Sequence, residues 1–235
     1  RVSIMRNEDF KKKILSEEGS SSNGLVKSII RNIDNIYVLD KIPDYEPHKE
    51  TSLGSKAKKL NREINDYIYD ILLEDDGNSL LYYPIGNYLD YSLEASLEMI
   101  SSDHTLLGLG DGGAHCATIC DASFTTHMLT FWGRDRTRGK KLDLPWIIKS
   151  YTRDNALAIG LEDRGLIKEG MKADINIIDF DNLTLYSPEI RYDLPAGGKR
   201  LVQRVDGYKY TIVSGKVTYV DGVSTGELPG RLIRS

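Results

Sequence analysis

Apolar residues follow two different periodicities along the first 160 residues. In the segment 8–18, Phe10, Ile14 and Leu15 fall on one helical face among charged residues, which predicts a short amphipathic helix. The run at 35–39 is instead continuous and rich in β-branched and aromatic residues, as in a short buried strand. The two patterns then alternate: helical at about 52–73, strand-like at 79–85, helical at 92–100 and strand-like at 105–110.

This alternation predicts an α/β fold. Runs that are apolar on both faces, separated by helices, are typical of parallel strands in βα units. We expect the order to continue to about Ile159, which gives residues 1–160 about three βα units. A closed (β/α) barrel requires eight strands, so these residues would form only part of one.

The pattern changes after Gly160. Residues 161–235 contain three β-rich runs, at 173–180, 208–213 and 216–220. Ser214-Gly215 is a two-residue connection of the kind that closes a tight hairpin, and Asp221-Gly222 marks the next turn. We therefore expect a small antiparallel β unit over 161–235, joined to the incomplete α/β part.

Composition and charge narrow the functional classes. The net charge of −4 and the pI of about 5.7 argue against a nucleic-acid partner. No apolar stretch approaches the roughly 20 residues that span a bilayer, so we expect no membrane association. Cys116 and Cys120 stand close together without a secretory leader, which is typical of a reduced, cytoplasmic protein. The start at Arg1, without an initiator Met, suggests a cut chain.

Asp111 is the strongest candidate for chemistry. It directly follows an apolar run, in Gly108-Leu109-Gly110-Asp111-Gly112-Gly113. A carboxylate at the C-terminal end of a barrel strand lies on the face where catalytic groups gather. In a metal hydrolase it can take a proton from the metal-bound water and deliver it to the leaving amine. The alternative is an ordinary turn aspartate, since Asp-Gly is a common turn pair.

His115, Cys116 and Cys120 form a second candidate, because histidine and thiolate are zinc ligands. Their Cys-x3-Cys spacing lacks a second pair, so buried cysteines without a metal are the favoured interpretation. The chain has four histidines and no His-x-His pair. We expect His127 to pack or cap near the helix that follows the third apolar run.

The basic segment 133–141 is a third candidate. It carries Arg134, Arg136, Arg138, Lys140 and Lys141 and could meet an anionic substrate. An exposed loop is the favoured alternative.

Several long motifs resemble one family in the right order. The run 108–116 with 119–123 resembles the last-strand motif of the D-aminoacylase-like (N-acyl-D-amino-acid deacylase) amidohydrolases. Residues 152–161 and 163–179 resemble the joint between barrel and β-sandwich in the amidohydrolase superfamily. The tail is similar too. It contributes 193–200, 212–217 and 225–231, and residues 43–47 fit an earlier loop.

The resemblance implies a fold and a reaction. The fold would be the C-terminal part of a TIM-like (β/α)8 barrel followed by a small β-sandwich. Asp111 would match the family's last-strand aspartate, a proton shuttle that can also approach the metal. The implied cofactor is zinc, but the family's His-x-His and mid-barrel ligands have no counterpart in this chain. Those ligands would lie on strands that precede Arg1.

Three hypotheses follow from this resemblance. The first is the C-terminal portion of a metal-dependent enzyme that hydrolyses the amide of N-acyl-D-amino acids or related linear amides, inactive as an isolated chain. The second is a non-catalytic, truncated relative. The third is a subunit that pairs with a separate metal-bearing half. Exposed barrel edges would also favour self-association.

Overall fold

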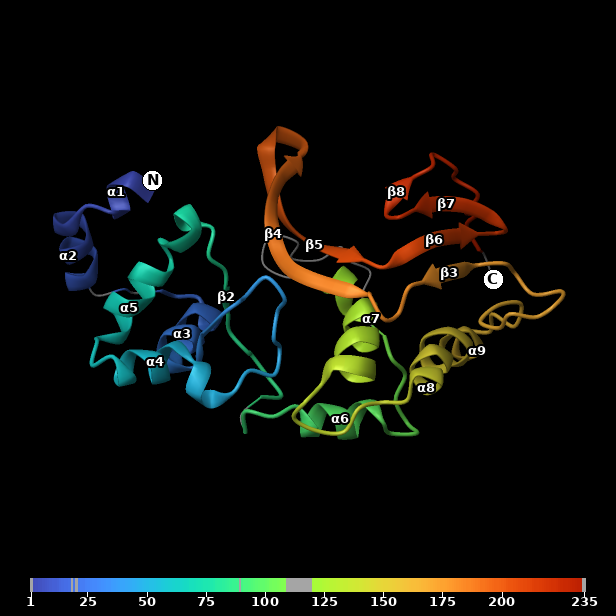
Figure 1. Ribbon diagram of the computed structural model, residues 1–235, viewed down its shortest axis with the longest axis horizontal. Coiled ribbons are helices and arrows are strands. Elements are labelled where there is room, and N and C mark those ends of the chain that lie inside the picture. The colour runs from blue at the N-terminus through green and yellow to red at the C-terminus, as the bar shows by residue number, and fades with distance from the viewer. Residues whose placement is uncertain (1, 18, 20, 89, 109–119, 234–235) are drawn as a thin grey trace. The chain divides into compact units, whose positions relative to one another are not determined.

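The computed structural model describes residues 2–17, 19, 21–88, 90–108 and 120–233 (Figure 1). The chain divides into two compact units, Arg1–Ser96 and Leu97–Ser235. The boundary that we expect near residue 160 stays a prediction. No helix among the described residues is long and apolar enough to cross a membrane.

The first unit is mainly helical. Its longer elements are α1 (Val2–Met5), α2 (Glu8–Ser16), α3 (Gly24–Arg31), α4 (Leu53–Lys59) and α5 (Ile64–Ile71), with short 3-10 turns at Ile33–Asn35, Lys49–Thr51 and Glu74–Gly77. Buried Ile36, Leu53 and Ile71 form its core. The predicted helix at 8–18 is confirmed as α2, which the Asn7 side chain caps by accepting from the Phe10 amide.

The helical stretch expected at 52–73 is interrupted. Asn61 takes a left-handed backbone conformation with φ 51°, so α4 ends before it and α5 begins after it. Ser52 caps α4 because its hydroxyl accepts a hydrogen bond from the Ser55 amide at 3.1 Å. Two short helices therefore replace the single expected one.

The predicted parallel pairing is wrong for the first two strands. β1 (Tyr37–Val38) pairs with β2 (Leu81–Tyr82) in antiparallel register, with Tyr37 opposite Tyr82. Apolar runs indicate where strands can form, but they do not encode the direction of pairing. The third run forms no strand over residues 105–108, and its last two residues lie outside the described part.

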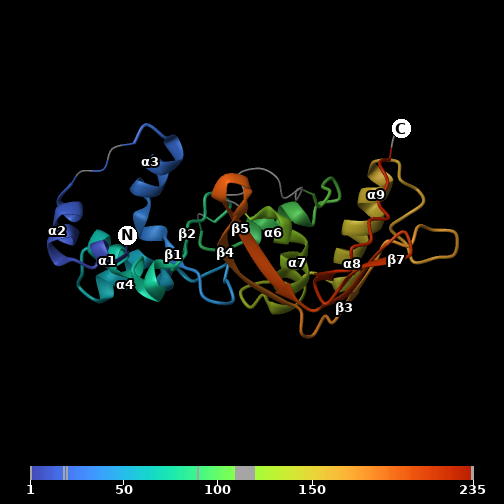
Figure 2. The ribbon, with the colours of Figure 1, turned by 90° about the horizontal axis from the view of Figure 1, so that it is seen from above.

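The second unit combines helices with two antiparallel sheets. Its helices are α6 (Glu94–Ile100), which belongs to this unit from Leu97 on, α7 (Phe124–His127), α8 (Leu144–Lys149) and α9 (Asn155–Ala158). A 3-10 turn at Asp121–Ser123 precedes α7. The π-helical segment η5 (Met128–Asp135) extends α7, and η6 (Ser150–Asp154) joins α8 to α9. Figure 2 shows α8 and α9 following one another in one helical stretch. The predicted helix at 92–100 is confirmed as α6.

The predicted antiparallel β unit is also confirmed. β3 (Ile175–Ile178), β6 (Tyr208–Val213), β7 (Lys216–Val220) and β8 (Val223–Ser224) form one sheet in the order β3-β6-β7-β8. Ser214 and Gly215 both have positive φ, at 50° and 76°, as a two-residue hairpin requires. Asp221 and Gly222 close the next hairpin in the same way.

The sequence patterns did not indicate the longest strands. β4 (Thr184–Leu194) and β5 (Gly198–Asp206) form a separate two-stranded ribbon joined by a 3-10 turn at Pro195–Gly197 (Figure 1). Neither a closed barrel nor a β-sandwich is formed by the residues that the structure describes.

Candidate functional site

The residues first expected to carry chemistry fall largely outside the described part of the chain. Asp111, His115 and Cys116 belong to the segment 109–119, so their predicted roles stay predictions. Cys120 is half-buried, and its backbone carbonyl accepts a hydrogen bond from the Ser123 hydroxyl at 3.1 Å.

A cavity in the second unit borders the described residues that lead into this segment. Its volume is about 330 Å³. The wall is drawn from α6, the stretch 105–108, the α7–η5 helix and η6, and consists of Met99, Ile100, Thr105, Leu106, Leu107, Gly108, Phe124, His127, Met128 and Tyr151. None of these residues is aspartate, glutamate, lysine or arginine, so the cavity suits an apolar group.

The helix formed by α7 and η5 supports one wall because its buried side chains fix it in the unit. Met128, Leu129 and Trp132 are almost fully buried. The Thr130 hydroxyl donates to the Thr126 carbonyl at 3.0 Å, which satisfies a buried polar group within the helix. Both π-helical segments contribute to the wall, η5 through Met128 and η6 through Tyr151. Such segments occur frequently at functional sites.

His127 is a neutral member of the wall. Its ring stacks on Phe131, with the ring centres 4.9 Å apart and the planes 10° apart. Burial lowers the pKa of His127 to about 4, so the imidazole carries no charge near pH 7. The predicted packing role is thereby confirmed.

Tyr151 is neutral for the same reason. Burial raises the pKa of its hydroxyl well above the ordinary value. Its ring meets the Phe124 ring edge-on, with the centres 5.5 Å apart. The Thr105 hydroxyl donates hydrogen bonds to nearby backbone carbonyls, including that of Met99 at 2.9 Å. The cavity therefore offers an uncharged, mainly apolar surface.

Asn155 positions the stretch that leads into the Asp111 motif. Its side-chain amide, on α9, donates to the Leu107 carbonyl at 2.6 Å. The bond satisfies a carbonyl that has no strand partner and ties residues 105–108 to a helix far along the chain. Sequence reasoning missed this role, because nothing in the local pattern of either residue indicates a contact 48 positions away.

Two arginines of the basic segment 133–141, Arg134 and Arg136, have structural roles. The Arg134 guanidinium donates to the carbonyls of Phe180, Asp181 and Leu183. Arg136 is buried, with 1% of its surface exposed, and lies over the Trp132 ring at 4.8 Å. The expectation of an exposed loop is wrong at Arg136. The structure gives no support for an anionic substrate at these two guanidinium groups.

The described residues do not fit a metal centre. Among them, no group of three or more histidine, cysteine, aspartate or glutamate side chains lies close enough to hold an ion. A catalytic zinc normally needs three protein ligands, and this part of the chain does not bring three together.

The mixed arrangement of helices and strands is consistent with an α/β protein, and the cavity lined in part by Leu106, Leu107 and Gly108 is a candidate binding site. The model of the amidohydrolase family matches residues 78–219, which is more than half of the chain. The chain therefore belongs to the amidohydrolase family and is a hydrolase of that type. Its family is generally metal-dependent. Comparison with curated proteins and with solved structures returns no match.

Proposed function

We propose that the protein hydrolyses the amide bond of an N-acyl-D-amino acid or a related linear N-acyl amide. The family match supports hydrolysis, and the motif at 108–116 points to the deacylase branch. The complete fold would be a TIM-like barrel with a β-sandwich, of which this chain contributes the C-terminal part. The metal would be zinc, held by residues outside the described part of the chain.

One structural observation carries the proposal. The uncharged cavity is lined by Leu106, Leu107 and Gly108, and Asp111 follows Gly108 by three residues in the sequence. An amide substrate needs both a proton-transfer group and a place for its apolar portion. In this proposal the cavity receives the acyl chain or the apolar side chain of the substrate.

Asp111 would act twice in the reaction. As a base it accepts a proton from the attacking water while the new carbon–oxygen bond forms. As an acid it then gives that proton to the amine nitrogen while the carbon–nitrogen bond breaks. The products are a carboxylate and a free amine, and the aspartate returns to its starting state.

The test is a substitution at Asp111, made in a preparation of the protein that hydrolyses N-acyl-D-amino acids. Asp111→Asn should lower kcat by about 10²–10⁴-fold, because the amide cannot accept the proton. Asp103→Asn is the matched control, since Asp103 is exposed and undergoes the same change. Hydrolysis is measured by release of free amine from paired D- and L-substrates. Unchanged turnover in Asp111→Asn would remove this residue from the mechanism.

A second candidate function is that of a subunit that completes a metal-bearing partner. In this alternative the chain is a complementing subunit that supplies Asp111 and the cavity to a separate metal-bearing half. Mixing it with a separately produced metal-bearing half should then restore metal-dependent amide hydrolysis. A non-catalytic relative would show no turnover in any mixture, and its Asp111→Asn variant would behave like the parent in every assay.

A further inference from the structure

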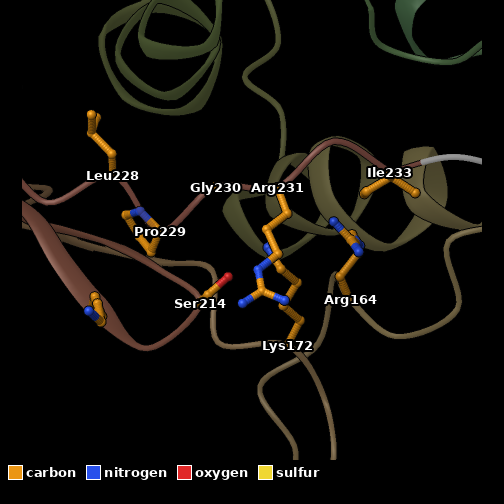
Figure 3. Close-up of a pocket in the computed structure, with 9 residues that line it drawn as sticks. Arg164, Lys172, Ser214, Leu228, Pro229, Gly230, Arg231 and Ile233 are labelled. Carbon is orange, nitrogen blue, oxygen red and sulfur yellow. The ribbon is translucent and has the colours of Figure 1, made fainter.

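A second, larger cavity lies at the edge of the β3-β6-β7-β8 sheet and differs from the first in its chemistry. Its volume is about 610 Å³. Four cationic side chains and one hydroxyl line it together with the tail of the chain, namely Arg164, Lys172, Ser214, Lys216, Leu228, Pro229, Gly230, Arg231 and Ile233 (Figure 3).

Two hydrogen bonds from backbone amides join two of the segments that line this cavity. The Gly215 amide in the β6–β7 turn donates to the Ala173 carbonyl at 2.9 Å. The neighbouring Ser214 amide donates to the Asp174 carboxylate at 2.8 Å. These two bonds fix the turn against the segment that carries Arg164 and Lys172. The tail that carries Arg231 forms the remaining wall.

Carboxylates pair with three of the four cations. Arg164 bonds Asp163 at 2.8 Å, and Lys216 lies 3.2 Å from Glu227.

Asp174 completes these pairs by contacting Lys172. Burial by itself would raise the pKa of Asp174, but hydrogen bonds from Lys172 and the Ser214 amide outweigh it and hold that pKa below its ordinary value. All three carboxylates are therefore committed to cations that are already present.

Arg231 is the cation that remains. Within the described part of the chain it makes no ion pair, although it lies beside Arg164 and Lys172. Figure 3 shows its guanidinium directed into the space between Ser214, Lys172 and Arg164. Like charges gathered without enough counter-charge repel one another, and an anion placed between them removes that repulsion.

We propose that this cavity binds a phosphate group, either as inorganic phosphate or on a small phosphorylated molecule. Arg231 would supply a forked pair of donors to two phosphate oxygens, with Lys172 as a point charge and the Ser214 hydroxyl as a further donor. The cavity holds considerably more than one phosphate ion, which leaves room for an attached organic group. The site is independent of amide hydrolysis.

Titration of the 235-residue chain with sodium phosphate, at ionic strength held constant with sodium chloride, tests this site. We expect saturable changes in the backbone amide NMR signals of Ser214 and Lys216. Arg231→Ala should weaken phosphate binding about tenfold or more, because a charge-assisted donor pair is lost. Arg231→Lys should restore part of the affinity, since it keeps the charge but not the fork.

The matched control is Arg191→Ala, which removes the same charge from an exposed position on β4 outside the cavity. It should bind phosphate like the parent chain. Equal affinity in the parent and in Arg231→Ala would overturn the site. Equal affinity for acetate and phosphate would overturn the assignment to phosphate. A signal confined to a phosphate monoester would place the organic group in the site as well.

Discussion

The two cavities of the second unit differ in the charge of their walls and in the part of the protein that forms those walls. The cavity beside residues 105–108 has no charged residue in its wall, and its only histidine is kept neutral by burial. The cavity beside the β6–β7 turn has four cations in its wall. The first is backed by buried helical residues such as Met128, whereas the second is closed by an exposed tail. The wall of the uncharged cavity therefore includes core residues, whereas the tail in the wall of the cationic cavity is exposed.

The largest expected effect tests that difference in support directly. Met128→Ala should lower the free energy of unfolding by about 2–5 kcal/mol, because it empties a buried position in the apolar cavity's wall. Leu228→Ala in the other wall should change it by less than about 0.5 kcal/mol, since 92% of Leu228 is exposed. Urea unfolding of both variants measures the contrast. Equal losses would show that the tail is as much part of the core as η5.

A somewhat smaller effect is expected from pH. His127 binds a proton near pH 6.5 in the unfolded chain but only near pH 4 in the folded one. Between these values the unfolded state holds more protons, so stability falls as the pH drops from about 6.5 to 4. The His127 side chain is half-buried, so water screens part of the effect, and we expect this residue to account for about 2–3 kcal/mol of that loss.

The measurement is thermal or urea unfolding across this pH range. His127→Gln should flatten the dependence of stability on pH between 6.5 and 4, relative to the parent chain. A parent and a His127→Gln variant with the same slope would contradict a buried, neutral imidazole in the apolar wall.

The smallest effect concerns substrate selectivity. A Cβ atom added at Gly108 meets no described atom within 4 Å, so Gly108→Val should fold normally and fill part of the apolar cavity. We expect kcat/KM for long acyl groups to fall about tenfold relative to acetyl substrates, as for a pocket that loses room for a few methylene groups. Gly86→Val is the control, because its added Cβ is equally uncrowded. A uniform loss for all acyl groups would mean that the cavity does not hold the acyl chain.

The sequence predicted those parts of the fold that depend on local chemistry. Ser214-Gly215 and Asp221-Gly222 specify their hairpins because two consecutive positive φ angles suit few other residue pairs. The amphipathic helix α2 follows from periodicity and its Asn7 cap. The direction of the β1–β2 pairing did not follow, since an apolar run fits either direction. The β4–β5 ribbon was missed because its strands mix charged and apolar residues without a clear alternation.

The candidate sites show the same division. The glycine-rich motif around Asp111 was visible in the sequence, whereas the cavity that Leu106, Leu107 and Gly108 line could not be predicted from it. Arg231 is far from Arg164 and Lys172 in the sequence, so its proximity to them emerges only when the β6–β7 turn is in place. Arg134 was recognised as basic, but its partners are backbone carbonyls, which every residue type has, so the sequence could not indicate them.

Arg134 also links two elements that are distant in the sequence. Its guanidinium satisfies carbonyl groups at Phe180, Asp181 and Leu183 that no strand partner reaches in the β3–β4 connection. The carbonyls of Asp181 and Leu183 would lose the Arg134 donor if η5 unwound, and η5 would lose an anchor if the connection moved. Local opening of the helix and local opening of the connection should therefore occur together, with amide hydrogens in both exchanging as one cooperative group.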